Sequence, residues 1–281
     1  MNFYTKPDSR NRTVVCHPRE NCDPALYANF LDPRLHGDGG LEERETRYLQ
    51  LEWIYKFLVA VILFFSSAEF AIAQVDQSYF DIDSISPQLF SPTLVINSPE
   101  WRSEVSQILK MQKNLDLEDL DQAVEEKHLQ PETIAQKIDP KLTRADYPKL
   151  YHLLDRVGDT SRGVTDNIKA HFDQTRPYLA DSRIKMLISP SKGGSYPSGH
   201  ATGSYIYAHV MSLLIPQQRE EFQNLAEKIA QHRILIGMHY PRDIRAGKEL
   251  SFLVIGGLTQ SSDFQKDLGK AALEIMEKKK F

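Results

Sequence analysis

Hydrophobic residues recur at helical spacing through most of the chain beyond residue 98. In residues 101–113, apolar side chains stand at positions 101, 105, 108, 109 and 111, on one face of a helix. Residues 145–157 and 160–172 show the same spacing, and the second segment is expected to stop before Arg176-Pro177, because a residue preceding proline disfavours helical angles. Further helices are predicted at residues 115–126, 131–138, 199–215, 217–237, 243–259 and 261–280.

Alternation typical of strands is nearly absent, and the sequence contains no internal repeat. Residues 74–98 are rich in Asp, Ser and Pro and are interpreted as an irregular lead-in. We therefore predict an all-α protein, a single-domain bundle of roughly six to nine helices. The domain is expected to span residues 74–281, with its catalytic core at about residues 145–258.

A short apolar run, FLVAVILFF at residues 57–65, follows Lys56 and leads to an A-I-A sequence that ends at Ala73. A positive charge, a short apolar run and an A-x-A sequence are the three parts of a secretory signal peptide. Because the run is too short to span a bilayer comfortably and Glu69 interrupts its extension, we favour a signal peptide at residues 51–73 over a membrane anchor. The expected location is periplasmic or secreted, and whether the segment is cleaved or kept as an anchor stays open.

Residues 1–50 precede this segment and show no amphipathic period. A signal peptide begins at the N-terminus, so we interpret these residues as a disordered extension or as the product of a start codon assigned too far upstream, with the true start near Leu51. Cleavage after Ala73 would leave residues 74–281 without cysteine. The fold would then depend on burial of its core and not on disulfides.

Composition and charge exclude several other classes of protein. The chain has 281 residues, of which 41% are hydrophobic and 26% are charged, as in ordinary globular proteins. A formal net charge of -4 gives no basic field of the kind that binds nucleic acid. Cys16 and Cys22, with His17 beside them, lack the spacing of a zinc site. We predict neither a metal nor a cofactor.

The first of three segments with candidate chemistry holds Lys169 and Arg176, seven positions apart. On a continuous helix this spacing puts both cations on one face, about 10 Å apart along the axis, where they can meet one anion. Taken alone, such a pair is more often a solvated basic edge.

The second segment, SYPSGH at residues 195–200, is predicted to begin a helix. Ser198 suits an N-cap, and Gly199 lets a ligand approach the backbone closely. The free N–H groups and the dipole at a helix start attract anions, and His200 would stand beside them. A simple turn with an exposed histidine explains this segment equally well when it is taken alone.

The third segment holds Arg233, His239 and Asp243 in the pattern R-x5-H-x3-D. We expect Pro241 to end the helix that carries Arg233, and Asp243 to stand at the start of the next helix. From there its carboxylate can cap that helix or bind Nδ1 of His239, which leaves Nε2 free as a nucleophile. An N-cap aspartate beside a structural histidine also fits this segment.

Together the three segments resemble the type 2 phosphatidic acid phosphatase superfamily, which includes the vanadium-dependent haloperoxidases, and most closely the class A bacterial non-specific acid phosphatases. The resemblance extends from about residue 98 to residue 257 and is strongest in the words SYPSGHAT and IGMHYPRDIRAG. It implies an α-helical bundle of the acid phosphatase and haloperoxidase type. It also implies metal-independent hydrolysis of phosphate monoesters through a phosphohistidine intermediate.

The resemblance also implies a role for each matching residue. His239 attacks phosphorus, Asp243 orients His239, and His200 protonates the leaving alcohol. Phosphate oxygens are bound by Lys169, Arg176, Ser198, Gly199 and Arg233. The sequence departs from the family at His232, where serine is common, and at Arg242, where a small residue is common. Four histidines match no motif and are interpreted as structural or surface residues: His152, His171, His209 and His232.

A neutral His239 and a charged His200 predict a bell-shaped pH profile with its optimum on the acid side of neutral, because a dianionic substrate and Asp243 favour the charged form of His200. The expected partners are small phosphate esters, without nucleic acid or stable membrane insertion, and a homo-oligomer stays open. Three alternatives are a vanadium haloperoxidase with the same pocket, a lipid phosphate phosphatase, and a phosphate-binding protein without catalysis.

Overall fold

The computed structural model describes Lys56 and residues 78–91, 93–190 and 193–278. The chain divides into two units, Met1–Ala73 and Gln74–Phe281, and apart from Lys56 the described residues belong to the second. Apart from Lys56, the expected extension at residues 1–50 and the expected signal peptide at residues 51–73 lie outside the described residues. They therefore stay predictions.

Every regular element in the described residues is helical, which confirms the all-α prediction for this part of the chain. The lead-in holds two 3₁₀ turns, η2 (Ile82–Ser84) and η3 (Pro87–Leu89), and η4 (Pro216–Gln218) joins α7 to α8. The α-helices are α2 (Pro99–Lys113), α3 (Leu117–Glu125), α4 (Pro131–Ile138), α5 (Pro148–Phe172), α6 (Pro177–Ala180), α7 (Gly199–Leu214), α8 (Arg219–Leu235), α9 (Pro241–Gln260) and α10 (Ser262–Lys278). None of the described helices combines the length and the apolar character that crossing a bilayer requires.

One continuous helix, α5, replaces the two helices predicted at residues 145–157 and 160–172. Gly158 lies in the middle of it, although glycine is a poor helix former. A Cβ at this position would overlap the hydroxyl group of Tyr207 on α7. Gly158 thus allows α5 and α7 to pack closely, and tertiary packing outweighs the local preference.

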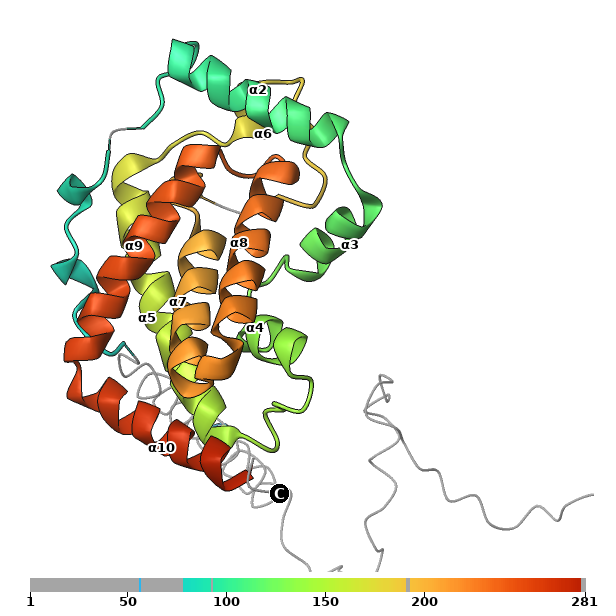
Figure 1. The fold of residues 1–281 in the computed structure, drawn as a ribbon. Coiled ribbons are helices and arrows are strands. Elements are labelled where there is room, and N and C mark those ends of the chain that lie inside the picture. Colours follow the sequence, from blue (N-terminus) through green and yellow to red (C-terminus); the bar gives the residue numbers. More distant parts are fainter. Residues whose placement is uncertain (1–55, 57–77, 92, 191–192, 279–281) are drawn as a thin grey trace, which may run out of the picture. The chain divides into compact units, whose positions relative to one another are not determined.

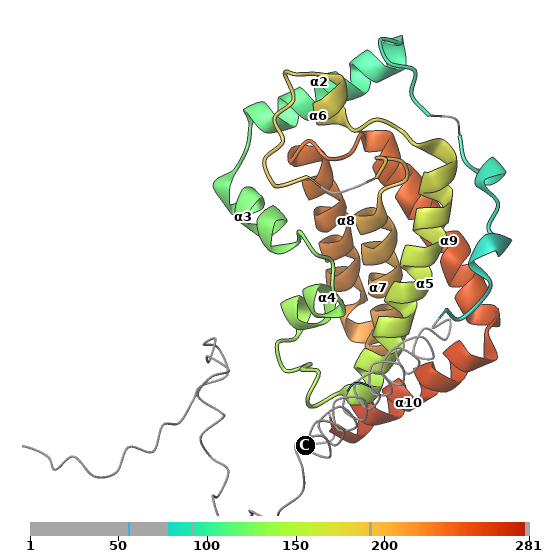
Figure 2. The same cartoon turned by 180° about the vertical axis from the view of Figure 1, so that it is seen from behind.

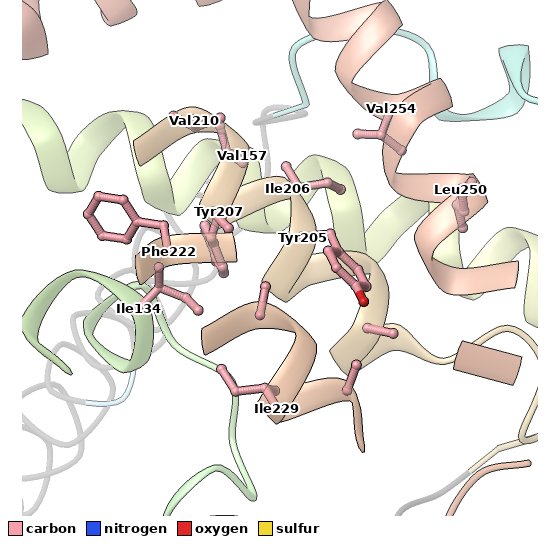
Figure 3. Packing of buried hydrophobic residues seen from close by; sticks show 14 of the residues in the cluster. Ile134, Val157, Tyr205, Ile206, Tyr207, Val210, Phe222, Ile229, Leu250 and Val254 are labelled. Carbon is pink, nitrogen blue, oxygen red and sulfur yellow. The ribbon is translucent and has the colours of Figure 1, made fainter. Parts of the chain in front are cut away.

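The central helix of the bundle is α7, which packs against α5, α8 and α9 (Figure 1). It is buried on almost all sides, which explains its continuous apolar sequence. In Figure 3, Ile206 and Val210 of α7 lie among side chains from the surrounding helices, such as Val157, Ile229 and Val254. Burial of these side chains, at about 25 cal/mol per Å² of apolar surface, is the main force that holds the helices together.

Four helix ends meet at one end of the bundle. The C-terminal ends of α5 and α8 and the N-terminal ends of α7 and α9 lie there, near α2 and α6 (Figures 1 and 2). This antiparallel arrangement brings the three candidate segments together, because each segment stands at one of these helix ends.

Candidate active site

The first segment does not form the continuous helical face that its spacing suggested. Lys169 lies in the last turn of α5, but Arg176 stands outside that helix as the N-cap of α6, so the expected shared face is wrong. The helix stops because Asp173 adopts a left-handed conformation, with φ of 41°. The two cations still meet at the loop before α7: Lys169 Nζ donates to the Gly194 carbonyl (3.0 Å), and Arg176 Nε donates to the Gly193 carbonyl (3.1 Å).

The second segment begins α7 as predicted. Ser198 is the N-cap, and its hydroxyl oxygen accepts a hydrogen bond from the N–H of Ala201 (3.3 Å). Gly199 and His200 form the first turn, at the positive end of the helix dipole. The N–H of Ser198 donates to the backbone carbonyl of Asp243 (2.9 Å), which ties the start of α7 to the start of α9.

The third segment runs from the last turn of α8, which carries Arg233, to the first turn of α9, which carries Asp243. The chain turns at Gly237, which has a φ of 76°. Pro241 begins α9 and does not end α8 as expected, because its fixed φ and missing N–H suit the first position of a helix. One carboxylate oxygen of Asp243, Oδ2, caps this helix by accepting from the N–H of Tyr240 (2.8 Å).

The imidazole of His239 lies between a carboxylate and a guanidinium. Its Nδ1 is 3.5 Å from Oδ2 of Asp243, and its Nε2 is 3.4 Å from Nη1 of Arg176. A guanidinium can only donate, so Nε2 presents its lone pair on that side and the ring hydrogen belongs on Nδ1. This is the tautomer that a nucleophilic Nε2 requires.

His239 and Asp243 are buried, whereas Lys169 and His200 are partly exposed, and the site is rich in positive charge. His239 is 4% exposed and Asp243 is fully buried. Burial lowers the pKa of His239 well below its ordinary value, so the imidazole is neutral. Four neighbouring groups that are positive when protonated lower it further, in this order: Arg176, Lys169, His200 and Arg233. All four of these predicted site residues therefore lower the pKa of the candidate nucleophile.

Burial also shifts the ionisation of the residues around His239. Loss of solvation raises the pKa of Asp243 to about 7, although the N–H of Tyr240 and the charge of Lys169 oppose the rise. It lowers the pKa of Lys169 to about 8, assisted by the charge of Arg176. Both groups are thus close to ionisation equilibria at physiological pH.

Arg233 is nearly completely buried, with 2% of its surface exposed. Its Nη2 donates to the carbonyl of Ala123 (2.9 Å) in α3. Its Nε has no hydrogen-bond partner among the described residues. A buried donor of this kind is suited to an oxygen of a bound ligand.

His200 stands beside Arg233, and its Nε2 lies 2.9 Å from the backbone carbonyl of Glu126. A carbonyl can only accept, so Nε2 carries a hydrogen and Nδ1 is the nitrogen left for a ligand. Burial and the charge of Arg233 lower the pKa of His200 to about 4. The pKa of His200 is thus lowered, whereas Asp243 and a bound dianion were expected to raise it. The free protein therefore holds His200 neutral.

Glu126 was not expected at the site. Its carboxylate is fully buried against His232 and Arg233, whereas the neighbouring Glu125 is exposed. The sequence offers no signal that separates the two glutamates, because both follow the same acidic, amphipathic pattern.

His232 is a buried, structural residue, which is one of the two roles expected for it, and the exposed His152 fits a surface role.

A cavity of about 300 Å³ adjoins the proposed proton donor. Its lining includes Gly199 and His200 from the first turn of α7, Arg162 and Thr165 from α5, and Tyr207. Within the described part of the chain, no group of three or more His, Cys, Asp or Glu side chains is placed to hold a metal ion.

The chain is similar to known bacterial phosphatases. Over 144 residues it is 28% identical to the non-specific acid phosphatase of Providencia stuartii, covering 50% of this chain but only 58% of that protein. It is 26% identical over 247 residues to the non-specific acid phosphatase of Salmonella typhimurium strain LT2, covering 83% of this chain and 94% of that protein. A solved bacterial vanadium-dependent iodoperoxidase superposes with a TM-score of 0.46 and 16% identity, over 59% of this chain and 51% of that one. The sequence profile of the PAP2 superfamily matches residues 160–267, a stretch that contains all three segments.

Proposed function

We propose that this protein is an acid phosphatase that hydrolyses phosphate monoesters through a phosphohistidine on His239. The observation that carries the proposal is the position of its imidazole: Nε2 lies 3.4 Å from the guanidinium of Arg176, and Nδ1 faces Asp243. The acid phosphatases to which the chain is similar support phosphatase activity.

The phosphate group is bound by cations that now bond to backbone carbonyls. Lys169 and Arg176 donate to the loop at residues 193–194, and a bound phosphate takes over part of this bonding. Arg233 contributes Nε, which has no hydrogen-bond partner in the described part of the chain, and the start of α7 contributes backbone N–H groups. Nε of Arg233 and the N–H groups of α7 are in place before substrate arrives, so they stabilise the charge on the phosphoryl oxygens at little cost in reorganisation.

In the first step, the lone pair of His239 Nε2 forms a bond to phosphorus while the bond from phosphorus to the ester oxygen breaks. The leaving alcohol takes a proton from Nδ1 of His200. Asp243 stabilises the positive charge that develops on the ring of His239. In the second step, water attacks phosphorus, its proton passes to His200, and the bond from phosphorus to nitrogen breaks to release inorganic phosphate.

The charge of the substrate makes His200 an acid. Its pKa of about 4 applies to the free protein, where burial and Arg233 disfavour the imidazolium. A bound phosphate places negative charge beside the ring and raises this pKa. Protonation of His200 therefore accompanies substrate binding, and acid conditions favour it.

The organic part of the ester occupies the cavity of about 300 Å³ beside His200. Because this volume is at the lower end for a small-molecule site, we propose compact esters as substrates. The signal-peptide pattern at residues 51–73 supports export, so we propose that the enzyme acts in the periplasm or outside the cell.

The test is an assay of the purified full-length chain against aryl and alkyl phosphates. We expect hydrolysis that is fastest in mild acid, unaffected by a chelator and inhibited by vanadate, which imitates pentacoordinate phosphorus. His239→Ala should lower kcat by roughly a thousand-fold or more, because it removes the nucleophile. His152→Ala, which changes an exposed histidine, is the matched control.

Wild-type turnover in the folded His239→Ala variant would contradict the proposal. So would a chelator-sensitive activity that a divalent cation restores. Peroxide-dependent oxidation of bromide in the presence of vanadate, without phosphatase activity, would identify a haloperoxidase instead.

A further inference from the structure

The C-terminal end of α3, which consists here of residues 123–125 and the C-cap Glu126, binds two of the proposed active-site residues. The carbonyl of Ala123 accepts from Nη2 of Arg233 (2.9 Å), and the carbonyl of Glu126 accepts from Nε2 of His200 (2.9 Å). The last carbonyls of a helix have no partner within the helix, and they form the negative end of its dipole. This turn is therefore suited to hold two groups that carry positive charge.

The side chain of Glu126 adds a full negative charge to the same turn. Its carboxylate is completely buried. One oxygen, Oε2, accepts from Nδ1 of His232 (2.7 Å) and lies 3.4 Å from Nη2 of Arg233. The other oxygen, Oε1, accepts from Nζ of Lys137 (3.2 Å).

Three neighbours keep this buried carboxylate ionised. Burial alone raises the pKa of Glu126, but the hydrogen bond and charge of His232, together with Lys137 and Arg233, outweigh it and bring the pKa below its ordinary value. A buried ion is tolerated only when its partners stay in place, and removal of one partner leaves the others uncompensated. The geometry of Arg233 thus depends on that of Glu126.

The arrangement leaves specific atoms of the active site available. Nη2 of Arg233 is occupied by α3, while Nε of the same guanidinium has no protein partner in the described residues. In His200 the bond to the Glu126 carbonyl occupies Nε2, so the proton for a leaving group must come from Nδ1. One turn of α3 thus fixes which edge of each side chain can meet a phosphate ester.

We propose that Glu126 is a positioning residue, whose carboxylate holds the guanidinium of Arg233 and whose backbone carbonyl holds the imidazole of His200. This inference rests on the proposed phosphatase function. His232 holds the carboxylate from the other side, so the pair of Glu126 and His232 fixes a phosphate-binding cation and a proton donor relative to each other.

The test compares Glu126→Gln with the wild type and with Glu125→Gln, the same change at an exposed position one residue away. Binding of inorganic phosphate is measured by calorimetry on the full-length chain. We expect Glu126→Gln to weaken binding by about ten-fold or more, because an amide cannot balance the buried guanidinium or keep its orientation. Glu125→Gln should bind phosphate as the wild type does.

Steady-state kinetics give a readout that a loss of stability alone does not change. An alkyl alcohol is a poorer leaving group than a phenol and depends more on a proton from His200. Glu126→Gln weakens the bonds to His232, Lys137 and Arg233 that anchor the carbonyl holding His200. It should therefore lower kcat for an alkyl phosphate more than for an aryl phosphate, whereas a smaller folded fraction lowers both equally. The ratio of the two kcat values should stay at the wild-type value in Glu125→Gln.

A folded Glu126→Gln variant with wild-type phosphate affinity and a wild-type ratio of kcat values overturns the proposal. If circular dichroism shows that this variant does not fold, Glu126→Asp and His232→Asn take its place, and unchanged phosphate affinity in both overturns the proposal equally. If the wild type binds phosphate but hydrolyses no ester, the proposed function fails. The calorimetric comparison then still decides whether Glu126 positions Arg233.

Discussion

Burial sets the charge of each residue at the candidate site. Lys169 shows the effect clearly: loss of solvation, and then the nearby charge of Arg176, lower its pKa to about 8, while Asp243 opposes the change. Free lysine has a pKa of about 10.4, so an ordinary lysine would stay charged throughout the neutral and mildly alkaline range. In this protein the ammonium group loses its proton just above neutral pH.

This shift predicts a further fall in the pH profile, on the alkaline side of the one that deprotonation of His200 produces. As pH rises through about 8, Lys169 becomes neutral and binds phosphate less well, so kcat/KM should fall. Lys169→Arg keeps a positive charge over this range and should move the fall to higher pH, even if its maximal rate is lower. Lys110→Arg, at an exposed position on α2, is the control. An alkaline limb at the same pH in Lys169→Arg and the wild type would assign the titration to another group.

The identities of the predicted site residues follow from the spacing of three short motifs, but their charge states do not. The neutral state of His200 in the free protein is the clearest case, because its pKa of about 4 depends on burial and on Arg233, which is distant in sequence. Glu126 illustrates the same limit, since only its position at the end of α3 distinguishes it from Glu125.

At the scale of helices, the site depends on the close approach of α9 to the start of α7. Gly247 of α9 makes this approach possible. A Cβ at this position would lie 2.7 Å from the carbonyl oxygen of Ser198 and 2.9 Å from Cβ of Ala201. The same contact region contains the hydrogen bond from Ser198 N–H to the carbonyl of Asp243 (2.9 Å).

Gly247→Ala should therefore separate the two helices and lower both stability and turnover. We expect a loss of about 1–3 kcal/mol in the free energy of unfolding, the usual cost of overpacking, measured by urea denaturation. Gly256→Ala is a matched control on the same helix, because open space surrounds that position. It should be neutral or more stable by up to about 1 kcal/mol, since alanine favours a helix. Equal stability of Gly247→Ala and the wild type would show that this contact is not tight.

Helix positions could be predicted from periodicity, but helix boundaries could not. The sequence suggested a break at Gly158, whereas the contact with Tyr207 requires a small residue in a continuous α5. Pro241 is compatible with either the end of one helix or the start of the next. Because the chain already leaves α8 at the turn around Gly237, Pro241 stands at the start of α9. Both outcomes depend on residues outside the local pattern.

At the scale of the whole domain, periodicity predicts helices but does not say which helix ends meet. The residue roles that the resemblance implies require the three segments to meet, and the contact between Arg176 and His239 agrees with this requirement. The role of α3 was not expected, because its bonds to the site use backbone carbonyls, which leave no mark on the sequence.

The central claim is that Nε2 of His239 becomes bonded to phosphorus during turnover. The most direct measurement mixes the full-length protein with an aryl phosphate, stops the reaction with alkali within one turnover, and locates phosphate on the digested protein by mass spectrometry. The account predicts phosphate on the peptide that contains His239, and none on that peptide from His239→Ala. Rapid hydrolysis with no phosphate on His239, or with phosphate on another residue, would contradict it.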